Sequence, residues 1–125
     1  MRIILLRHFK TVNNAARRIM GWGDAPRAEG WEADLRYVDR VLARKHVQID
    51  AFYSSALGRA RDTALYYAEK RGQDFVRSTP ELNEVNYGSF IELSKQRVEQ
   101  ICPEYKTDAD YVFPEGESFR QMQRR

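Results

Sequence analysis

The stretch RIILLRHFK (Arg2–Lys10) sets the fold that we expect for this chain. Its apolar run, Ile3–Leu6, predicts a strand over Arg2–Arg7 that is covered on both faces, as strands in parallel sheets are. Arg7 and His8 follow directly, although an arginine and a histidine favour water or an anion over a protein core. A strand that delivers both side chains to the mouth of a pocket explains this order. A plain strand end explains it too, so the rest of the sequence must decide.

Downstream of this strand, the sequence alternates between helical and strand-like patterns. Periodicity and turn residues predict a loop over Thr11–Gly30 with a helical turn around Ala15–Met20, a helix from Trp31 to near His46, a strand over Ile49–Ser54, a helix over Arg59–Arg71, a strand over Asp74–Ser78, and a helix around Leu93–Ile101. This order predicts an α/β domain with a mainly parallel sheet.

The carboxyl ends of the predicted strands carry polar groups. Arg7 and His8 follow the first strand, and Ser54 and Ser55 end the second. Ligands of parallel sheets bind beyond the carboxyl ends of the strands. The placement therefore favours a pocket at this edge.

Composition narrows the class of protein. A chain of 125 residues with 42% hydrophobic and 31% charged residues fits one folded domain, and its apolar runs are too short for a membrane span. The net charge of +3 does not favour a nucleic-acid binder, because basic and acidic residues alternate. The single cysteine, Cys102, cannot form an intrachain disulfide, which makes a reducing cytoplasm the expected location.

The residue types near the predicted pocket suit phosphoryl transfer. A phosphate needs fixed cationic donors, and planar guanidinium groups supply paired hydrogen bonds. A neutral imidazole nitrogen can attack phosphorus, and a carboxylic acid can protonate the leaving group. Arg7, His8, Arg59 and a later glutamate would form this set if the fold brings them together.

The sequence also resembles a known family over nearly its whole length. LLRHFKTVNN resembles the Arg-His-Gly-x-Thr-x-x-Asn signature of the histidine phosphatases, the superfamily of the cofactor-dependent phosphoglycerate mutases. The stretches GWGDAPRAEGW, FYSSALGRARDTA, LNEVNYGSF and PEGESF are similar to later stretches of that family, in the family's order. The resemblance implies a phosphoglycerate mutase-like fold, a three-layer α/β sandwich around a mainly parallel sheet.

By this resemblance, each site residue receives a role. His8 would be the nucleophile that becomes phosphorylated, and Glu84 would protonate the leaving group and then activate water. Arg7 and Arg59 would hold the phosphate. The resemblance further implies that Asn14 and Gly21 help to form the substrate cradle, although the neighbouring Asn13 could take the place of Asn14.

The implied function is hydrolysis of a small phosphomonoester, without a metal or any other cofactor. Phosphoglycerate mutase-type transfer is the alternative closest to it, and the compact NEVNYGSF stretch favours the phosphatase branch only weakly. A relative without catalysis, which binds a phosphorylated ligand or a partner protein, is the other alternative. The sequence leaves open whether the chain forms a homo-oligomer.

Three departures from the family pattern stand out. Phe9 replaces a glycine, so its side chain must find room or narrow the pocket, and Lys10 is a milder change. The family's second pocket histidine is not matched, since His46 lies in an unrelated context. Residues 1–125 would thus form one histidine phosphatase-like domain without the family's C-terminal strand and helix. The chain could be part of a longer product, which we favour, could receive the strand from a partner, or could be a short relative.

Overall fold

The part of the fold that precedes Pro80 is built from two short parallel strands with helices packed beneath them. The computed structural model describes all 125 residues. In chain order, the helices and strands are α1 (Val12–Ala15), α2 (Trp31–Arg44), β1 (Tyr53–Ser55), α3 (Gly58–Glu69), β2 (Arg77–Thr79), α4 (Lys95–Ile101) and α5 (Phe119–Gln123), with three short 3₁₀ turns between β2 and α5. Strand β1 pairs in parallel with β2, which places Ser54 opposite Ser78.

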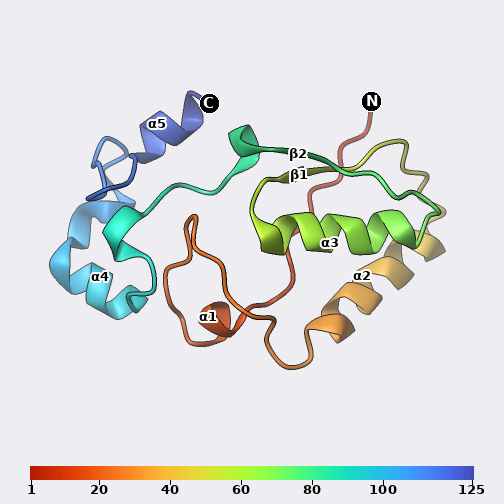
Figure 1. The fold of residues 1–125 in the computed structure, drawn as a ribbon, viewed down its shortest axis with the longest axis horizontal. Coiled ribbons are helices and arrows are strands. Elements are labelled where there is room, and N and C mark those ends of the chain that lie inside the picture. Colours follow the sequence, from red (N-terminus) through yellow and green to blue (C-terminus); the bar gives the residue numbers. More distant parts are fainter.

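Helices α3 and α2 stack in layers beneath the strand pair (Figure 1). Helix α3 lies against the strands, and α2 lies on the other side of α3. The predicted helix from Trp31 is confirmed, and it buries Leu35 and Leu42 at the predicted spacing. The helix predicted over Arg59–Arg71 is confirmed with bounds shifted by one or two residues.

The predicted strand over Arg2–Arg7 is wrong as a strand. The segment makes no backbone hydrogen bond, and its side chains are exposed, with Leu5 at 89%. An apolar run favours extended backbone, but a strand also needs a neighbouring strand, and none of the described segments pairs with this one. The other two predicted strands form only at their carboxyl ends, as β1 and β2.

The loop between Thr11 and Gly30 folds differently from the prediction. The helical turn lies at Val12–Ala15 rather than around Ala15–Met20. The Thr11 side chain accepts a hydrogen bond from the Asn14 backbone, and the Asn14 side chain accepts one from the Thr11 backbone. This capping box starts the helix at Val12.

Two apolar clusters form the core. One joins Phe9 to Leu35 of α2 and Tyr67 of α3. The other joins Ile19, from the loop after α1, to six residues of the final third of the chain: Val85, Phe90, Val98, Cys102, Tyr105 and Phe113. The helix predicted around Leu93–Ile101 is confirmed as α4, and Cys102 is buried. None of the helices is long and apolar enough to cross a bilayer.

Candidate active site

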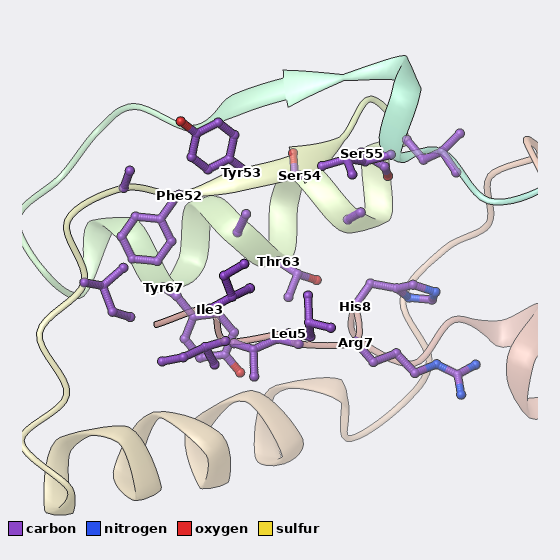
Figure 2. Close-up of a pocket in the computed structure, with 18 of the residues that line it drawn as sticks. Ile3, Leu5, Arg7, His8, Phe52, Tyr53, Ser54, Ser55, Thr63 and Tyr67 are labelled. Carbon is purple, nitrogen blue, oxygen red and sulfur yellow. The ribbon is translucent and has the colours of Figure 1, made fainter. Parts of the chain in front are cut away.

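A pocket of about 770 Å³ opens between the amino-terminal segment, β1 and one face of α3. Figure 2 shows Ile3 and Leu5 along this pocket, with Phe52 and Tyr53 on the opposite side, and with Arg7 and His8 at one end. Arg59 and Glu84 also line the pocket. The sequence correctly placed Arg7 and His8 at a pocket, although the backbone before them is not a paired strand.

The imidazole of His8 is held in one tautomer. Its Nδ1 lies 2.6 Å from the carbonyl oxygen of Phe9, and a carbonyl can only accept. The proton therefore resides on Nδ1, and Nε2 carries a free electron pair. The Nε–H of Arg59 donates to that Nε2 at 3.2 Å, which fits the same assignment. The ring thus presents an unprotonated nitrogen to the pocket.

The environment of His8 also disfavours the charged ring. Its pKa is lowered from 6.5, mainly because partial burial penalises the imidazolium. The positive charges of Arg59 and Arg7 lower the pKa further, while the Phe9 carbonyl and Asp24 act in the opposite direction. Neutral His8 is the form able to act as a nucleophile.

Arg59 is the buried centre of the site. Its side chain is 2% exposed, although it carries a charge. Nη1 donates to the carbonyl of Gly23 at 2.7 Å, and Nη2 donates to the carbonyl of Gly21 at 2.8 Å and to Glu84 Oε2 at 2.8 Å. A buried guanidinium must find such partners, because an unpaired one costs several kcal/mol, on the order of 3–5. The fork is therefore fixed in direction, with Nε aimed at His8.

Glu84 brings a carboxylate to the same point. Its side chain is 44% exposed, and its Oε2 accepts from Arg59. The Glu84 backbone carbonyl accepts from the indole Nε1–H of Trp22 at 2.7 Å. The structure thus brings His8, Arg59 and Glu84 together from three separate parts of the chain.

Arg7 differs from Arg59 in its surroundings. It is exposed and has no hydrogen-bonded partner among the described contacts, and Figure 2 shows its side chain extending to the same side as His8. An exposed arginine near a pocket mouth is free to turn towards an anion. Both arginines lie near enough to act electrostatically on the His8 ring.

The two expected cradle residues occupy different places. The Gly21 carbonyl accepts from Arg59, so this glycine contacts the site through its backbone. Gly21 has a φ of +49°, and a Cβ there would lie 3.0–3.1 Å from Tyr87 and Val85 atoms. Asn14 lies outside the pocket, because its side chain caps α1. Gly21 is thus in contact with the site, whereas Asn14 supports the neighbouring loop.

Thr63 is a site residue that sequence reasoning did not single out. Its hydroxyl accepts from the Phe9 backbone N–H at 3.0 Å and donates to the Arg59 carbonyl at 2.8 Å. It therefore ties the backbone next to His8 to α3. Its spacing could have revealed it, since Thr63 lies one helical turn after Arg59 on the same face.

Phe9 leaves the pocket open. Its ring is buried beside Leu35 and Tyr67, and it packs edge-on against Trp31. The Arg27 guanidinium lies 5.1 Å from the Phe9 ring centroid and 4.4 Å from that of Trp31. The residue in the family's glycine position thus finds room in the core and is not among the residues that line the pocket.

The charge offered to an anion at this site comes from arginine. The chain contains no group of three or more His, Cys, Asp or Glu side chains with the arrangement of a metal site. Within the pocket, Arg7 and Arg59 are the basic groups next to His8.

Comparisons with known proteins agree with this arrangement. The family model described as histidine phosphatase superfamily (branch 1) matches residues 3–125. A 2,3-bisphosphoglycerate-dependent phosphoglycerate mutase of Bartonella tribocorum is 32% identical over 94% of the chain. A probable phosphoglycerate mutase, GpmB, of Yersinia pestis is 33% identical over the whole chain. The chain spans 61% and 59% of these two relatives.

Solved structures give the same result. A mycobacterial glucosyl-3-phosphoglycerate phosphatase in complex with VO₃ has a TM-score of 0.78 and 27% identity, and the match covers 92% of this chain and 58% of that one. An alpha-ribazole phosphatase from Shigella flexneri has a TM-score of 0.79 at 23% identity, covering 95% and 60%, which supports the fold alone. The predicted α/β, phosphoglycerate mutase-like fold is confirmed. With its family model matched from residue 3 to residue 125, the chain belongs to branch 1 of the histidine phosphatase superfamily.

Proposed function

We propose that this chain belongs to an enzyme that hydrolyses a small phosphomonoester through a phosphohistidine formed on His8. The observation that carries the proposal is the state of the His8 ring. Nδ1 is bound to the Phe9 carbonyl, so the free electron pair lies on Nε2, beside the buried Arg59 fork. A neutral nitrogen next to fixed cationic donors is the arrangement that attack on a phosphate requires.

The first step transfers the phosphoryl group to the protein. Nε2 of His8 attacks phosphorus in line, forming an N–P bond as the ester P–O bond breaks. Arg59 and Arg7 neutralise the phosphoryl oxygens, and the Arg59 Nε–H exchanges its His8 acceptor for one of these oxygens. The leaving alkoxide takes a proton from the Glu84 carboxyl group.

The second step returns the protein to its starting state. The Glu84 carboxylate takes a proton from water, and the oxygen attacks phosphorus as the N–P bond breaks. Inorganic phosphate leaves, and Nε2 regains its electron pair. In this proposal Gly21 holds the Arg59 fork through its carbonyl, and Asn14 acts through the α1 loop that precedes Gly21. No step uses a metal ion.

The named relatives support this class of chemistry and leave its acceptor open. Two are called phosphoglycerate mutases, and the structural neighbour at 27% identity is called a phosphatase. A mutase passes the phosphoryl group to a substrate hydroxyl instead of water. We also propose that residues 1–125 belong to a single domain, because Arg59 joins the two core regions through Gly21 and Glu84.

The test is phosphorylation of the chain itself. Incubation with an aryl phosphate such as p-nitrophenyl phosphate should yield acid-labile, base-stable protein-bound phosphate that is lost in His8→Ala. His46→Ala is the matched control and should retain the label. Binding of vanadate in the same two variants gives a second measurement that does not need turnover. If neither phosphate nor vanadate binding depends on His8, the proposal is wrong and a non-catalytic relative remains.

A further inference from the structure

The segment that carries Glu84 is held by a second arginine, far along the chain. Nη1 of Arg125 donates to the carbonyls of Pro80 and Glu81 at 2.8 and 3.2 Å. Nη2 donates to the carbonyls of Asn83 and Glu84 at 2.9 and 3.0 Å. One side chain thus contacts four backbone carbonyls of one short segment.

Glu117 fixes the direction of this second fork. Its Oε1 lies 2.8 Å from Arg125 Nη2, and its Oε2 lies 3.3 Å from Arg125 Nε. The same Oε1 accepts from the backbone N–H of Asn86 at 2.9 Å, beyond the other end of the segment. Both charged side chains are mostly buried, 22% and 18% exposed. Two parallel charge-assisted hydrogen bonds of this kind fix geometry as well as adding stability.

Trp22 is the third residue that holds the backbone of Glu84 in place. Its indole N–H donates to the same Glu84 carbonyl that accepts from Arg125, and the Arg125 guanidinium lies 5.7 Å from the Trp22 ring centroid. The backbone of Glu84 is therefore held by two donors, while its carboxylate meets Arg59. We name Arg125, Glu117 and Trp22 the Glu84 clamp.

The Glu84 carboxylate needs such a support because burial does not fix it. Its side chain is 44% exposed, and a single ion pair at such a site leaves the side chain freedom to move. A general acid must lie within hydrogen-bond reach of the leaving oxygen. A misplacement of about 1 Å can cost on the order of 10²-fold in rate.

We propose that Arg125, locked by Glu117, is a positioning residue that sets the Glu84 carboxylate against Arg59 for the acid and base steps. This inference rests on the proposed function for the acid and base steps, but the hydrogen bonds of Arg125 and Glu117 are present whatever reaction the protein catalyses. Arg125 touches neither the pocket nor His8, so it acts only through the backbone of the Glu84 segment.

The experiment combines Arg125→Lys with Glu84→Gln, singly and together. Lysine keeps the charge and loses the fork that bonds the four carbonyls. Arg124→Lys is the matched control, because Arg124 is the exposed neighbour in the chain. The first readout is the nuclear magnetic resonance signal of the buried Arg59 Nε–H. The second is the decay rate of phosphohistidine formed on His8, with the KM of the aryl phosphate measured beside it.

We expect Arg125→Lys to move the Arg59 signal in the same direction as Glu84→Gln, with no further movement in the double variant. Phosphohistidine decay should slow about tenfold or more in Arg125→Lys at nearly constant KM, and should not slow further in the Glu84→Gln background. Arg124→Lys should match the parent chain in both readouts. If Arg125→Lys slowed phosphohistidine decay equally in the parent chain and in Glu84→Gln, Arg125 would have a general structural role and the proposal would be overturned.

Two further outcomes separate this inference from the proposed function. If the Arg59 signal moves as expected but no phosphohistidine forms, the clamp stands and the hydrolase proposal falls. If phosphohistidine forms and neither readout responds to Arg125→Lys, the clamp is wrong. Should Arg125→Lys fail to fold, Glu117→Gln replaces it, because the glutamine oxygen can still accept from the Asn86 N–H, while the negative charge and the second acceptor that hold the Arg125 fork are lost.

Discussion

The Nε–H of Arg59 donates to Nε2 of His8 over 3.2 Å, so the electron pair proposed to attack phosphorus accepts a hydrogen bond. An arriving phosphoryl group offers oxygens that accept the same N–H more strongly. In the proposed mechanism, anion binding and release of the nucleophile are therefore one event. The buried arginine would keep His8 oriented until an anion takes its hydrogen bond.

Replacement of Arg59 by lysine should abolish this coupling. Lysine keeps the charge but cannot reach His8, Gly21 and Glu84 at once, because it lacks the planar fork. We expect phosphorylation of His8 to slow by about 10²–10³-fold, the usual effect of losing a donor to a developing charge. Arg61→Lys, on an exposed position of the same helix, should leave the rate unchanged. A similar rate in both variants would contradict the assignment of Arg59.

The lowered pKa of His8 predicts a pH dependence. Burial and the two arginines favour the neutral ring, so the reactive form should persist below pH 6.5. Because the unfolded chain binds the proton more tightly, stability from this group is present above pH 6.5 and is lost as the pH falls below it. Nuclear magnetic resonance titration of His8, against a peptide LLRHFK, checks the direction. A pKa in the protein equal to or above that of the peptide would contradict the prediction.

Loss of the Thr63 hydroxyl should disturb both the fold and the site. Thr63→Val leaves the Phe9 N–H without an acceptor at a buried position, which costs about 1–3 kcal/mol of unfolding free energy. The same change frees the backbone beside His8, so we expect slower phosphorylation as well. Urea unfolding measures the first effect and labelling from an aryl phosphate the second. Thr63→Ser keeps the hydroxyl and should preserve both.

Removal of the Phe9 ring should affect stability more than chemistry. The ring is 4% exposed within the cluster of Leu35 and Tyr67, so Phe9→Ala should lower the unfolding free energy by about 3–5 kcal/mol. Tyr37→Ala, at an exposed aromatic position on α2, should change it by less than about 0.5 kcal/mol. His8 should still bind vanadate in folded Phe9→Ala. Loss of that binding in the folded variant would show that Phe9 shapes the pocket.

The sequence was most informative where chemistry depends on local residue types. The pattern from Trp31 predicted α2 within a few residues, and the motif residues His8, Arg59 and Glu84 do come together. Helix periodicity and the order of motifs can be read from the sequence alone, so predicting them does not require knowledge of the fold.

The errors arise where structure depends on distant partners. Arg2–Arg7 has the composition of a strand, yet pairing needs a second segment that local sequence does not reveal. The contact of Arg125 with the segment before Glu84 spans about forty residues, and no spacing rule predicts such a contact.

The unpaired backbone of the Arg2–Leu6 segment has a consequence for handling the protein. The backbone N–H and C=O groups of this segment are unpaired, and Ile3 and Leu5 beside them are exposed, so another extended chain can form backbone hydrogen bonds with it. At high concentration, the same segment of a second molecule can pair with it, and burial of the apolar side chains between the two copies favours aggregation. Solubility should therefore improve when a charged side chain replaces Leu5.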